Sequence, residues 1–564
     1  MKDTIQKQYE LWLKKAVDDS GIQKELIAIR TDDTKIEDAF YRNLAFGTGG
    51  LRGVIGAGTN RINIYTVAKA SQGLADYINR HFQKDARKIA VSYDSRLKSD
   101  LFAQVSSCVF AANGIQVYLY EQLMPTPCLS FAVRELNCAA GIMITASHNP
   151  SKYNGYKVYG ADGGQITTEA ADEILGEIEK LNLFSDVKKV DFAQAVTDGS
   201  IRYIPEDVYT SFIEQVKKQT LLGKDDSVDK SIAIVYSPLN GTGLKPILSV
   251  LDECGYTNVR VVKEQEAPNG YFPTCPYPNP EIKEAMALGI EYAKRYQADL
   301  LLATDPDCDR VGIAVKDKND NYTLLSGNEV GMLLLDYICS RRQALGMMPK
   351  EPIAIKTIVT TDMAEQIAKH YGVKMVNVLT GFKFIGEQIG MLEQKRCKDS
   401  YIFGFEESYG YLSGTYVRDK DAVNAAFLIC EMFVYYASKG LGLLDKLNEL
   451  YATYGYCLNT LHSYEFEGVA GFSKMQKIMQ AFRGKPSSFG GKKVCGILDY
   501  AEGIDGLPAS DVLKFTLEDH CSFVVRPSGT EPKLKVYISV SAENAEKASE
   551  LEQRMIRDLN VFFQ

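Results

Sequence analysis

A short polar loop, residues 145–150, follows an apolar stretch that predicts the end of a buried strand. In an open α/β sheet, ligands collect just beyond the carboxyl ends of the strands, so this loop should carry Ser147 to the reactive edge. Ser147 is therefore a candidate nucleophile, and His148 stands directly beside it. An ordinary turn would use the same residue types, so the rest of the chain must decide between the two interpretations.

Lys157 lies on an alternating stretch, residues 151–159, that continues from this loop and predicts a strand. On such a strand its side chain could face back toward Ser147. A lysine near other cations, or partly removed from water, has a lowered pKa and can exchange a proton with a sugar hydroxyl. A lysine that points into solvent is the alternative.

Three aspartates, Asp305, Asp307 and Asp309, follow the apolar stretch 298–303 at alternate positions. An extended backbone with this spacing points the three side chains to the same side. Carboxylates packed together repel one another unless a cation lies between them, and a small set of hard oxygen ligands suits Mg²⁺. A solvated turn is the alternative, but the preceding strand is apolar, so the pattern favours a metal site. Arg310 follows directly and could hold a phosphoryl group.

Polar residues also follow the predicted strand 401–405. Glu406 offers hydrogen-bond acceptors and Ser408 offers both a donor and an acceptor, which suits the hydroxyl groups of a sugar. The charged segment 418–421, which includes Lys420, adds cations a short distance further along.

Two further segments have the composition of anion sites. Residues 46–53 form a glycine-dense stretch that predicts a loop, where the backbone could approach a ligand and Arg52 could reach a phosphate. Near the carboxyl terminus, a predicted turn between two apolar strands combines exposed backbone N–H groups, two hydroxyls and an arginine, which together make a phosphate cradle. A plain hairpin is the alternative. The residues of this turn are Arg526, Ser528, Gly529 and Thr530.

Size and composition limit the classes of function. A chain of 564 residues is too long for one core and predicts roughly three to five domains. Its net charge of −8 argues against a nucleic acid or an anionic membrane as the main partner. The amino terminus predicts an amphipathic helix, not a signal peptide, and no stretch has the long uncharged run of a membrane span. Twelve scattered cysteines indicate reduced thiols in a cytoplasmic protein and disfavour structural zinc.

Strands and helices alternate through most of the chain, which predicts α/β units whose sheets are mostly parallel. Residues 1–40, 68–82, 329–342 and 422–444 are predicted to be helical, the last of them a buried helix. The final part changes to short strands with helices over 472–483 and 543–559, which indicates an α+β unit. The expected domains are 1–205 with the serine loop, 206–325 with the aspartates, 326–453 with the sugar loop and 454–564 with the phosphate cradle.

Taken together, residues 145–150, 305–310, 406–408 and 526–530 resemble motifs of the α-D-phosphohexomutase superfamily, in the order of that family. Residues 46–53, 381–386 and 405–411 are most similar to its phosphoglucomutase/phosphopentomutase branch. The resemblance covers nearly the whole chain. It implies an α/β protein with four domains, three similar α/β domains plus a C-terminal α+β domain, around a central cleft.

The resemblance also implies roles for individual residues. Ser147 matches the serine that is phosphorylated in the active enzyme, and the three aspartates match Mg²⁺ ligands, with a phosphoserine oxygen as a further ligand. His148 and Lys157 match basic residues near the transferring group, and we expect Lys157 to be the general acid/base. Phosphate contacts are expected from Arg52 and Arg310. Sugar contacts are expected from Glu406, Ser408, Lys420, Thr380, Gly381 and Lys383, and a clamp for the non-reacting phosphate from Arg526, Ser528, Gly529 and Thr530.

These parts imply a monomeric or homodimeric isomerase that interconverts α-D-glucose 1-phosphate and glucose 6-phosphate, with Mg²⁺ and glucose 1,6-bisphosphate as intermediate and activator. Residues 405 and 409 differ from those of shorter hexose enzymes, which leaves a phosphopentomutase as the main alternative. A sugar-bisphosphate synthase, a metal-dependent phosphohydrolase and a non-catalytic sensor are more distant ones. A protease-like Ser/His pair is disfavoured, because adjacent side chains on one strand should diverge.

Overall fold

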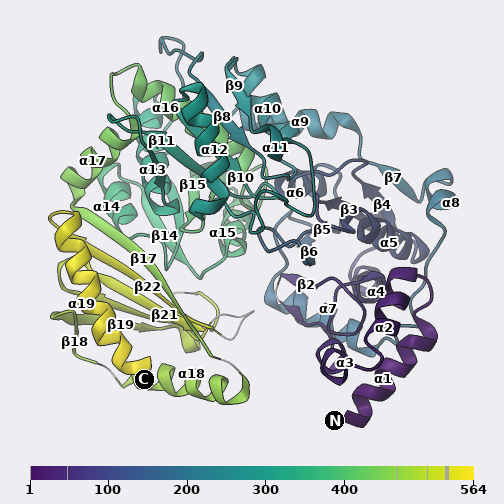
Figure 1. Cartoon of the computed structure of the whole chain (residues 1–564). Helices are drawn as coiled ribbons and strands as arrows, with labels where there is room; N and C mark the ends of the chain where they lie inside the picture. Colours follow the sequence, from purple (N-terminus) through teal and green to yellow (C-terminus); the bar gives the residue numbers. More distant parts are fainter. Residues whose placement is uncertain are drawn as a thin grey trace.

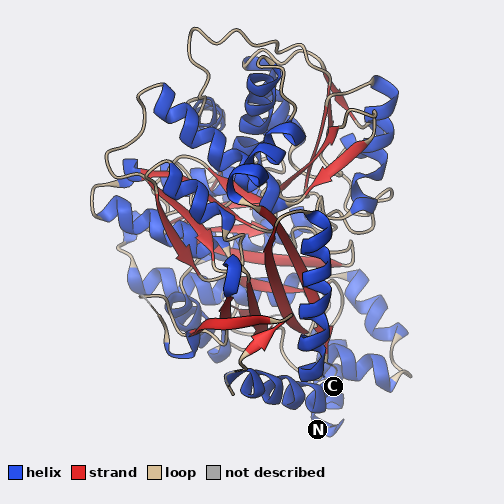
Figure 2. Ribbon diagram, turned by 90° about the vertical axis from the view of Figure 1, so that its left-hand side faces the viewer, coloured by secondary structure: helices blue, strands red, loops and turns tan. Residues whose placement is uncertain are grey.

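The computed structural model describes residues 2–47, 49–466, 468–484, 486–504, 506–527 and 533–563. Within these residues the strands form four main sheets, three of them mixed and one antiparallel (Figure 1). Helices lie against the sheets, as the view in Figure 2 shows. The expected fold class, three α/β units followed by an α+β unit, is therefore confirmed.

The first sheet has the strand order β1-β2-β6-β5-β3-β4-β7. Strands β5, β3, β4 and β7 are parallel, whereas β6, β2 and β1 continue the sheet in antiparallel fashion. The strands are β1 (Phe46–Gly47), β2 (Gly50–Val54), β3 (Lys88–Tyr93), β4 (Gln116–Leu119), β5 (Ala140–Ile144), β6 (Tyr153–Gly160) and β7 (Ile201–Tyr203). The accompanying helices are α4 (Ile64–His81), α5 (Ser99–Ala112), α6 (Thr126–Glu135), α7 (Thr168–Lys180) and α8 (Phe192–Thr197).

Three helices precede this sheet: α1 (Lys2–Lys15), α2 (Ser20–Ala28) and α3 (Asp33–Phe40). Trp12 of α1 has a buried ring that packs edge-on against Phe40, Tyr65 and Phe184, and Tyr9 of the same helix donates to the Leu26 carbonyl of α2 at 2.8 Å. Aromatic contacts of this kind add to the free energy gained by burying the ring. The amino-terminal helices are therefore part of the first unit's core.

The second sheet has the order β12-β11-β10-β8-β9, with β10, β8 and β9 parallel and β11 and β12 antiparallel. Its strands are β8 (Ile234–Ser237), β9 (Val259–Val261), β10 (Leu300–Thr304), β11 (Val311–Lys316) and β12 (Tyr322–Leu325). Its helices are α9 (Glu206–Lys217), α10 (Leu244–Glu253), α11 (Lys263–Glu266) and α12 (Lys283–Tyr296).

The third sheet has the order β14-β13-β15-β16, and only β16 is antiparallel. Its strands are β13 (Ile353–Thr357), β14 (Lys374–Val378), β15 (Tyr401–Glu406) and β16 (Gly410–Leu412). Its helices are α13 (Gly327–Ala344), α14 (Met363–His370), α15 (Phe382–Gln394), α16 (Ala422–Ala437) and α17 (Leu443–Tyr454). One continuous apolar core reaches from the first unit through the second to this one, and includes Leu129, Val216 and Leu334.

The fourth sheet is antiparallel throughout, in the order β17-β22-β21-β20-β19-β18, with α19 packed along one face (Figure 1). Its elements are β17 (Tyr456–Glu465), α18 (Gly468–Arg483), β18 (Ser488–Phe489), β19 (Lys492–Asp499), β20 (Leu513–Leu517), β21 (Ser522–Pro527), β22 (Lys533–Ala542) and α19 (Ala545–Phe563). A separate core, which includes Phe482, Phe515 and Phe523, holds this unit together. Short 3₁₀ turns of the chain lie at Lys84–Ala86, Lys398–Ser400, Tyr500–Glu502 and Glu518–His520.

Some predicted boundaries are wrong for identifiable reasons. Helix α4 begins at Ile64, four residues before the predicted start, because the Asn63 side chain accepts hydrogen bonds from its first N–H groups. The predicted buried helix over 422–444 ends at Ala437, and Gly440 adopts a positive φ of 73° that breaks it. The predicted loop over 46–53 is largely strand, since β2 pairs with β6.

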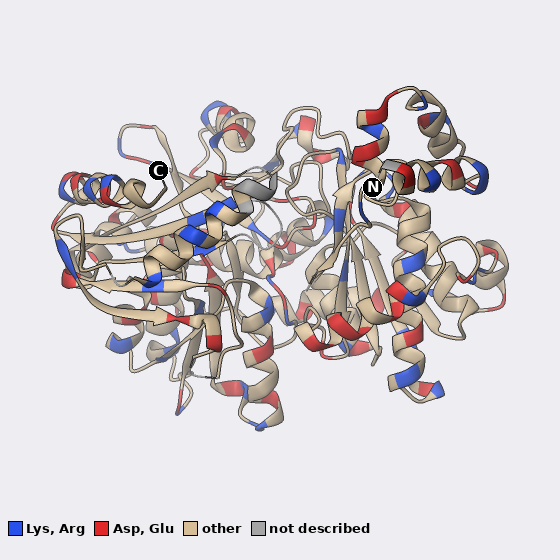
Figure 3. Ribbon diagram, turned by 90° about the horizontal axis from the view of Figure 1, so that it is seen from below, with Lys and Arg blue, Asp and Glu red and all other residues tan. Residues whose placement is uncertain are grey.

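Charge is distributed over the surface in both signs. In Figure 3, Lys and Arg alternate with Asp and Glu along the outer helices. Among the described residues, no helix combines the length and the apolar composition that crossing a membrane requires. The twelve cysteines, all within the described part of the chain, are free thiols.

Candidate active site

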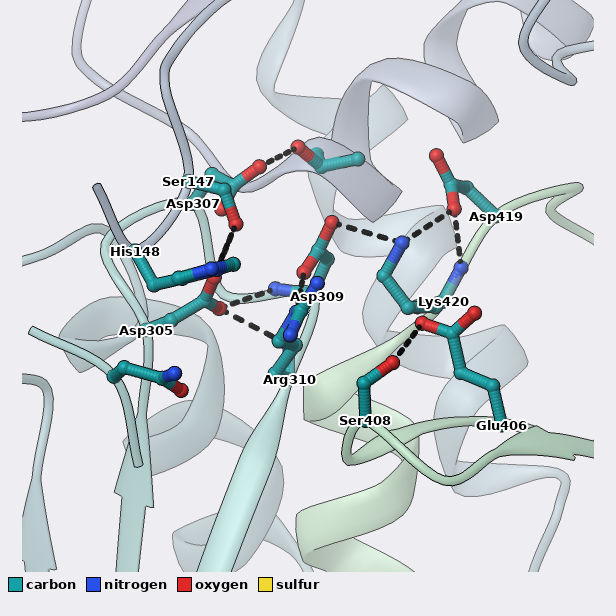
Figure 4. A network of polar contacts seen from close by, with 12 residues as sticks. Ser147, His148, Asp305, Asp307, Asp309, Arg310, Glu406, Ser408, Asp419 and Lys420 are labelled. Carbon is teal, nitrogen blue, oxygen red and sulfur yellow. Dashed lines mark hydrogen bonds and ion pairs between the residues drawn. The ribbon is translucent and has the colours of Figure 1, made fainter. Parts of the chain in front are cut away.

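Ser147 lies just past the end of β5, a strand that is buried along its whole length. Its φ of 51° is unusual for a residue other than glycine, and such strain is characteristic of functional positions. The Ser147 backbone N–H donates to the hydroxyl of Thr145 at 2.8 Å, and its own Oγ donates to Asp305 Oδ2 at 2.8 Å. The turn thus aims this hydroxyl from the first sheet at the second (Figure 4).

Arg96 holds the loop behind the serine, and the sequence analysis missed it. Its buried guanidinium donates to the backbone carbonyls of Ser147 and Asn149, and to those of Pro150 and Tyr153 at 3.0 Å each. The available signal was its position, because it follows β3, which lies beside β5 in the sheet and ends at the same edge. Four bonds from one rigid fork fix the loop's conformation.

The three aspartates meet on the turn between β10 and β11 (Figure 4). Their carboxylate oxygens lie within 4.8 Å of one another, and their exposed fractions do not exceed 1%. The spacing predicted an extended chain here, and that prediction is wrong. The chain bends at Cys308, where φ is 51°. The bend, not strand alternation, brings the carboxylates together.

The donor set fits a hard divalent cation. One oxygen each of Asp307 and Asp309 is buried with no hydrogen-bond partner among the described residues. Buried carboxylate oxygens without donors are costly unless a cation neutralises them. Carboxylates are also the ligands that Mg²⁺ and Ca²⁺ prefer. The residues present therefore suit a metal site of this class.

Lys157 extends from β6 toward the aspartates, with its Nζ 2.8 Å from Asp307 Oδ2 and 3.4 Å from Asp309 Oδ2. Burial alone would lower the pKa of Lys157, but the two carboxylates outweigh it and raise this pKa. The predicted lowering of the lysine pKa is therefore wrong for this arrangement. Burial favours protonation of Asp307 too, yet the Lys157 ammonium holds the pKa of Asp307 below its usual range.

The pKa of Asp305, the remaining aspartate, is shifted in the opposite direction to that of Asp307. Burial, and then the charges of Asp307 and Asp309, raise the pKa of Asp305 well above its ordinary value. Thr126 is a second contact that sequence analysis missed, since its Oγ1 donates to Asp307 Oδ2 at 2.8 Å. Helix α6 of the first unit thereby contacts the aspartate turn of the second.

The side chains of Ser147 and His148 were expected to diverge, but His148 Nδ1 lies 3.2 Å from the serine Oγ. The left-handed backbone at Ser147 breaks the strand alternation on which that expectation depended. Burial, followed by the nearby guanidinium groups of Arg310 and Arg52, lowers the pKa of His148 well below its ordinary value. The imidazole is therefore neutral at physiological pH.

Both predicted arginines reach this end of the site. Arg52, on β2, donates from Nη1 to Asn149 Oδ1 at 3.3 Å. Arg310 donates from Nη1 to Glu281 Oε1 at 2.5 Å, and its backbone N–H donates to Asp305 Oδ1 at 3.0 Å. Glu281, which the sequence analysis did not select, therefore orients Arg310.

The sugar loop approaches from the third sheet (Figure 4). Glu406 is the last residue of β15 and accepts a hydrogen bond from Ser408 Oγ at 3.0 Å. Lys420 Nζ lies 3.2 Å from both Asp309 Oδ2 and Asp419 Oδ1. Burial raises the pKa of Glu406, although the positive charge of Lys420 acts to lower it. Lys420 thus connects the third unit to the aspartate turn.

The second predicted sugar segment is only partly placed at the site. Thr380 lines the cavity described below, and its buried Oγ1 has no hydrogen-bond partner among the described residues. Gly381 has a φ of 120°, which requires glycine, and directly precedes α15. Lys383 belongs to that helix, where its Nζ lies 4.8 Å from the centre of the Phe384 ring, and it does not line the cavity.

A cavity of ≈ 730 Å³ connects these elements to the fourth sheet. All four units contribute side chains to its wall, including Arg52, His148, Arg310, Ser408 and Arg526. Arg526 lies on β21 and is half-buried. The predicted clamp residues Ser528, Gly529 and Thr530 lie outside the described residues. The structure therefore brings the serine, the aspartates, the sugar loop and Arg526 around one site.

Comparison with protein families gives four consecutive matches to models of the phosphoglucomutase/phosphomannomutase family. They cover alpha/beta/alpha domain I at residues 43–183, domain II at 208–318, domain III at 326–454 and the C-terminal domain at 474–557. The chain belongs to this family. The resemblance inferred from the motifs is thereby confirmed.

Individual relatives agree with this assignment. A phosphoglucomutase of Staphylococcus saprophyticus is 36% identical over 555 residues, which cover 96% of this chain and 98% of that protein. Two solved structures share the fold. The open form of the Paramecium phosphoprotein parafusin has a TM-score of 0.66 at 18% identity, covering 93% of this chain and 94% of its own. Aspergillus fumigatus N-acetylphosphoglucosamine mutase, in complex with GlcNAc-6P and magnesium, has a TM-score of 0.50 at 15% identity. The match covers 92% of this chain and 95% of that one.

Proposed function

We propose that this protein is a phosphoglucomutase that interconverts α-D-glucose 1-phosphate and glucose 6-phosphate through a phosphoserine at Ser147 and a glucose 1,6-bisphosphate intermediate. The observation that carries the proposal is the serine hydroxyl 2.8 Å from a buried aspartate of a three-carboxylate cluster, whose chain neighbours His148 and Arg310 line the same cavity as Arg526. Relatives of the same length that bear the phosphoglucomutase name support it.

We propose Mg²⁺ as the metal, held by Asp305, Asp307 and Asp309 together with an oxygen of phosphorylated Ser147. A magnesium ion there would neutralise charge on the transferring phosphoryl group. The unpartnered oxygens of Asp307 and Asp309 support this assignment. So does the magnesium bound by the Aspergillus fumigatus mutase of the same fold.

In the proposed reaction, the 6-hydroxyl of glucose 1-phosphate attacks the phosphorus of phosphoserine 147, and the P–Oγ bond breaks. The bisphosphate then turns over within the cavity, Ser147 Oγ attacks the phosphorus at position 1, and the bond between that phosphorus and the sugar O1 breaks, which releases glucose 6-phosphate and restores the phosphoserine. Phosphoryl transfer depends mainly on positioning and on charge stabilisation, which Arg52 and Arg310 supply around the reacting phosphate. Lys157 accepts and returns the proton of the attacking hydroxyl, a role that needs its neutral amine, whereas Asp307 and Asp309 favour the ammonium in the free protein.

Substrate recognition is assigned to the opposite walls of the cavity. Glu406, Ser408 and Lys420 would bind the sugar hydroxyls, because they offer acceptors and donors at the end of β15. The non-reacting phosphate would lie in the turn of the fourth unit. The remaining proposed contacts are Thr380, Gly381 and Lys383 for the sugar, His148 for the reacting phosphate, and Arg526, Ser528, Gly529 and Thr530 for the distal phosphate. We also propose domain boundaries after residues 205, 325 and 453.

Comparative turnover tests the proposal. Glucose 1-phosphate and ribose 1-phosphate are supplied separately, each with its own bisphosphate primer, and the 6-phosphate or 5-phosphate product is measured. Faster turnover of glucose 1-phosphate supports the proposal, whereas preference for ribose 1-phosphate would make the protein a phosphopentomutase. Release of inorganic phosphate without isomerisation would identify a phosphohydrolase and overturn the mutase assignment.

A further inference from the structure

The fourth unit meets the third across a narrow apolar seam. Ile358, Val359 and Leu379 of the third unit pack against four side chains of the fourth, namely Tyr500, Val512, Val524 and Tyr537. Apolar contacts are not directional, so such a seam stabilises the contact between two units without fixing the angle between them. A directional contact must set that angle.

Asp362 supplies a directional contact at the edge of the seam. It directly precedes α14, but its carboxylate makes no capping hydrogen bond to that helix. Lys514 of β20 donates to its Oδ1 at 2.8 Å, and Ser522 of β21 donates to its Oδ2 at 2.7 Å. From its own unit, Lys356 of β13 donates to Oδ1 at 3.1 Å. The carboxylate therefore joins two strands of the fourth sheet to the third unit.

The cluster is buried and charged. The exposed fractions of the side chains are 0% for Lys356, 9% for Lys514 and 25% for Asp362. Glu365 is the only other described acid paired with these lysines, 3.4 Å from Lys356 Nζ. Burial would raise the pKa of Asp362, but the two ammonium groups hold it below its usual range, so the carboxylate is ionised. Charge-assisted hydrogen bonds of this kind have strict geometry.

Strand β21 connects this contact to the cavity. Ser522, Val524 and Arg526 alternate along it, so their side chains share one face of the sheet. Ser522 is bonded to Asp362, Val524 packs in the apolar seam, and Arg526 lines the cavity. Ser522 and Arg526 are four steps apart along the strand, a distance of about 13 Å. Because they belong to the same strand, the Asp362 contact at Ser522 also fixes the position of Arg526.

We propose that Asp362 is a positioning residue, which anchors β21 so that Arg526 keeps its place in the wall of the cavity that His148 and Arg310 also line. Asp362 and Ser522 line the same cavity as Arg526, and the role proposed for the anchor is to act through strand geometry, not through contact with the substrate. Its functional consequence rests on the proposed mutase activity, in which Arg526 binds the non-reacting phosphate. Loss of the anchor should weaken substrate binding without slowing phosphoryl transfer in the bound complex.

Two variants test the anchor in the full-length protein. Asp362→Asn removes the negative charge, and Ser522→Ala removes one interdomain hydrogen bond while leaving every charge in place. We expect KM for glucose 1-phosphate to rise about tenfold in the first and about threefold in the second, as loss of a charge-assisted bond predicts. The kcat should stay within about threefold of wild type, since β5 and β10 are untouched. Small-angle X-ray scattering of Asp362→Asn should give a larger radius of gyration.

The matched control is Asp511→Asn, which breaks an ion pair with Arg483 inside the fourth unit, 2.7 Å in length, and leaves the seam intact. Its KM and scattering should equal those of wild type. Unchanged KM in both test variants, or an equal rise in the control, would overturn the proposal. If Asp362→Asn does not fold, the KM of Ser522→Ala alone decides whether the anchor positions Arg526. If wild type fails to convert glucose 1-phosphate, the function is wrong, and the scattering comparison alone decides whether Asp362 sets the angle.

Discussion

The two ends of the cavity are held in different ways. Behind one end, which His148 and Arg310 line, Ser147 and the three aspartates are at most 3% exposed and are bonded across two units, through Ser147 to Asp305 and through Thr126 to Asp307. At the other end, Arg526 is half-buried on a sheet that has its own core. That sheet meets the third unit through the apolar seam and the Asp362 cluster.

The difference matches two physical requirements. Phosphoryl transfer needs reacting atoms in a fixed geometry, so the protein builds that end from buried, multiply bonded groups. In the proposed reaction the bisphosphate reorients and presents each of its phosphates to the distal end in turn, so that end must accept two geometries. We therefore expect changes at the serine end to alter the rate of transfer, and changes at the arginine end to alter apparent affinity.

Removal of the serine hydroxyl is the strongest test of the first expectation. Ser147→Ala should lower kcat on the order of 10⁴-fold or more, as loss of a covalent nucleophile does in other enzymes. The thermal midpoint should change little, since the oxygen takes part in only two described hydrogen bonds, to Asp305 and with the His148 ring. Ser106→Ala is the matched control, a buried serine on α5 that should keep full activity. Substantial turnover by Ser147→Ala would disprove the covalent role.

Removal of divalent metal should have the next largest effect. Chelation should lower turnover at least about 100-fold, because a bound cation supplies several kcal/mol of charge stabilisation. The far-UV circular dichroism spectrum should stay the same, since β10 and β11 are held by backbone pairing to their neighbouring strands. Added Mg²⁺ should restore turnover. Full activity in excess chelator would show that the buried carboxylates serve another purpose.

Arg526 should separate the two ends of the cavity. Arg526→Ala should raise KM for glucose 1-phosphate by about 10- to 100-fold, the cost of one or two charge-assisted hydrogen bonds. The kcat should fall much less than in Ser147→Ala. Arg557→Ala, which removes an exposed arginine from α19, should leave both constants unchanged. An Arg526→Ala enzyme with a normal KM and a low kcat would contradict the division between fixed and adjustable ends.

Glu407 should produce the smallest effect, on stability. It lies between the two ends, where Thr357 and Thr360 each donate to it at 3.3 Å, and burial together with Glu406 raises its pKa to about 7. Because the folded pKa exceeds the unfolded value, this residue's contribution to stability is complete below about pH 4.5 and declines as pH rises toward 7.

Denaturant unfolding at pH 5 and pH 7.5 measures this dependence. Wild type should lose about 1 to 3 kcal/mol more unfolding free energy between the two pH values than Glu407→Gln, which cannot ionise. Glu449→Gln, which changes an exposed glutamate of α17, should behave as wild type. Equal pH dependence in all three proteins would show that Glu407 is ionised in the folded state.

Much of the chemistry was predictable because it depends on residue types in short segments. The serine loop, the aspartates and the sugar loop each follow an apolar strand, and ligands collect beyond the carboxyl ends of strands in an open α/β sheet. Arg526 was selected from the composition of a predicted turn. The alternation of strands and helices likewise predicted three α/β units, and its loss after residue 454 predicted a different final unit.

Only the tertiary structure decided how these groups act on one another. The bend at Cys308, not strand alternation, gathers the aspartates, and the left-handed turn at Ser147 brings His148 beside it. The pKa of Lys157 depends on two carboxylates 150 and 152 residues away in the sequence, which outweigh its burial. Arg96, Glu281 and Asp362 act through partners from distant segments, and only the position of Arg96 after β3 offered a signal in the sequence. Residue type and local spacing therefore determined the chemistry available, whereas long-range packing determined charge state, orientation and reach.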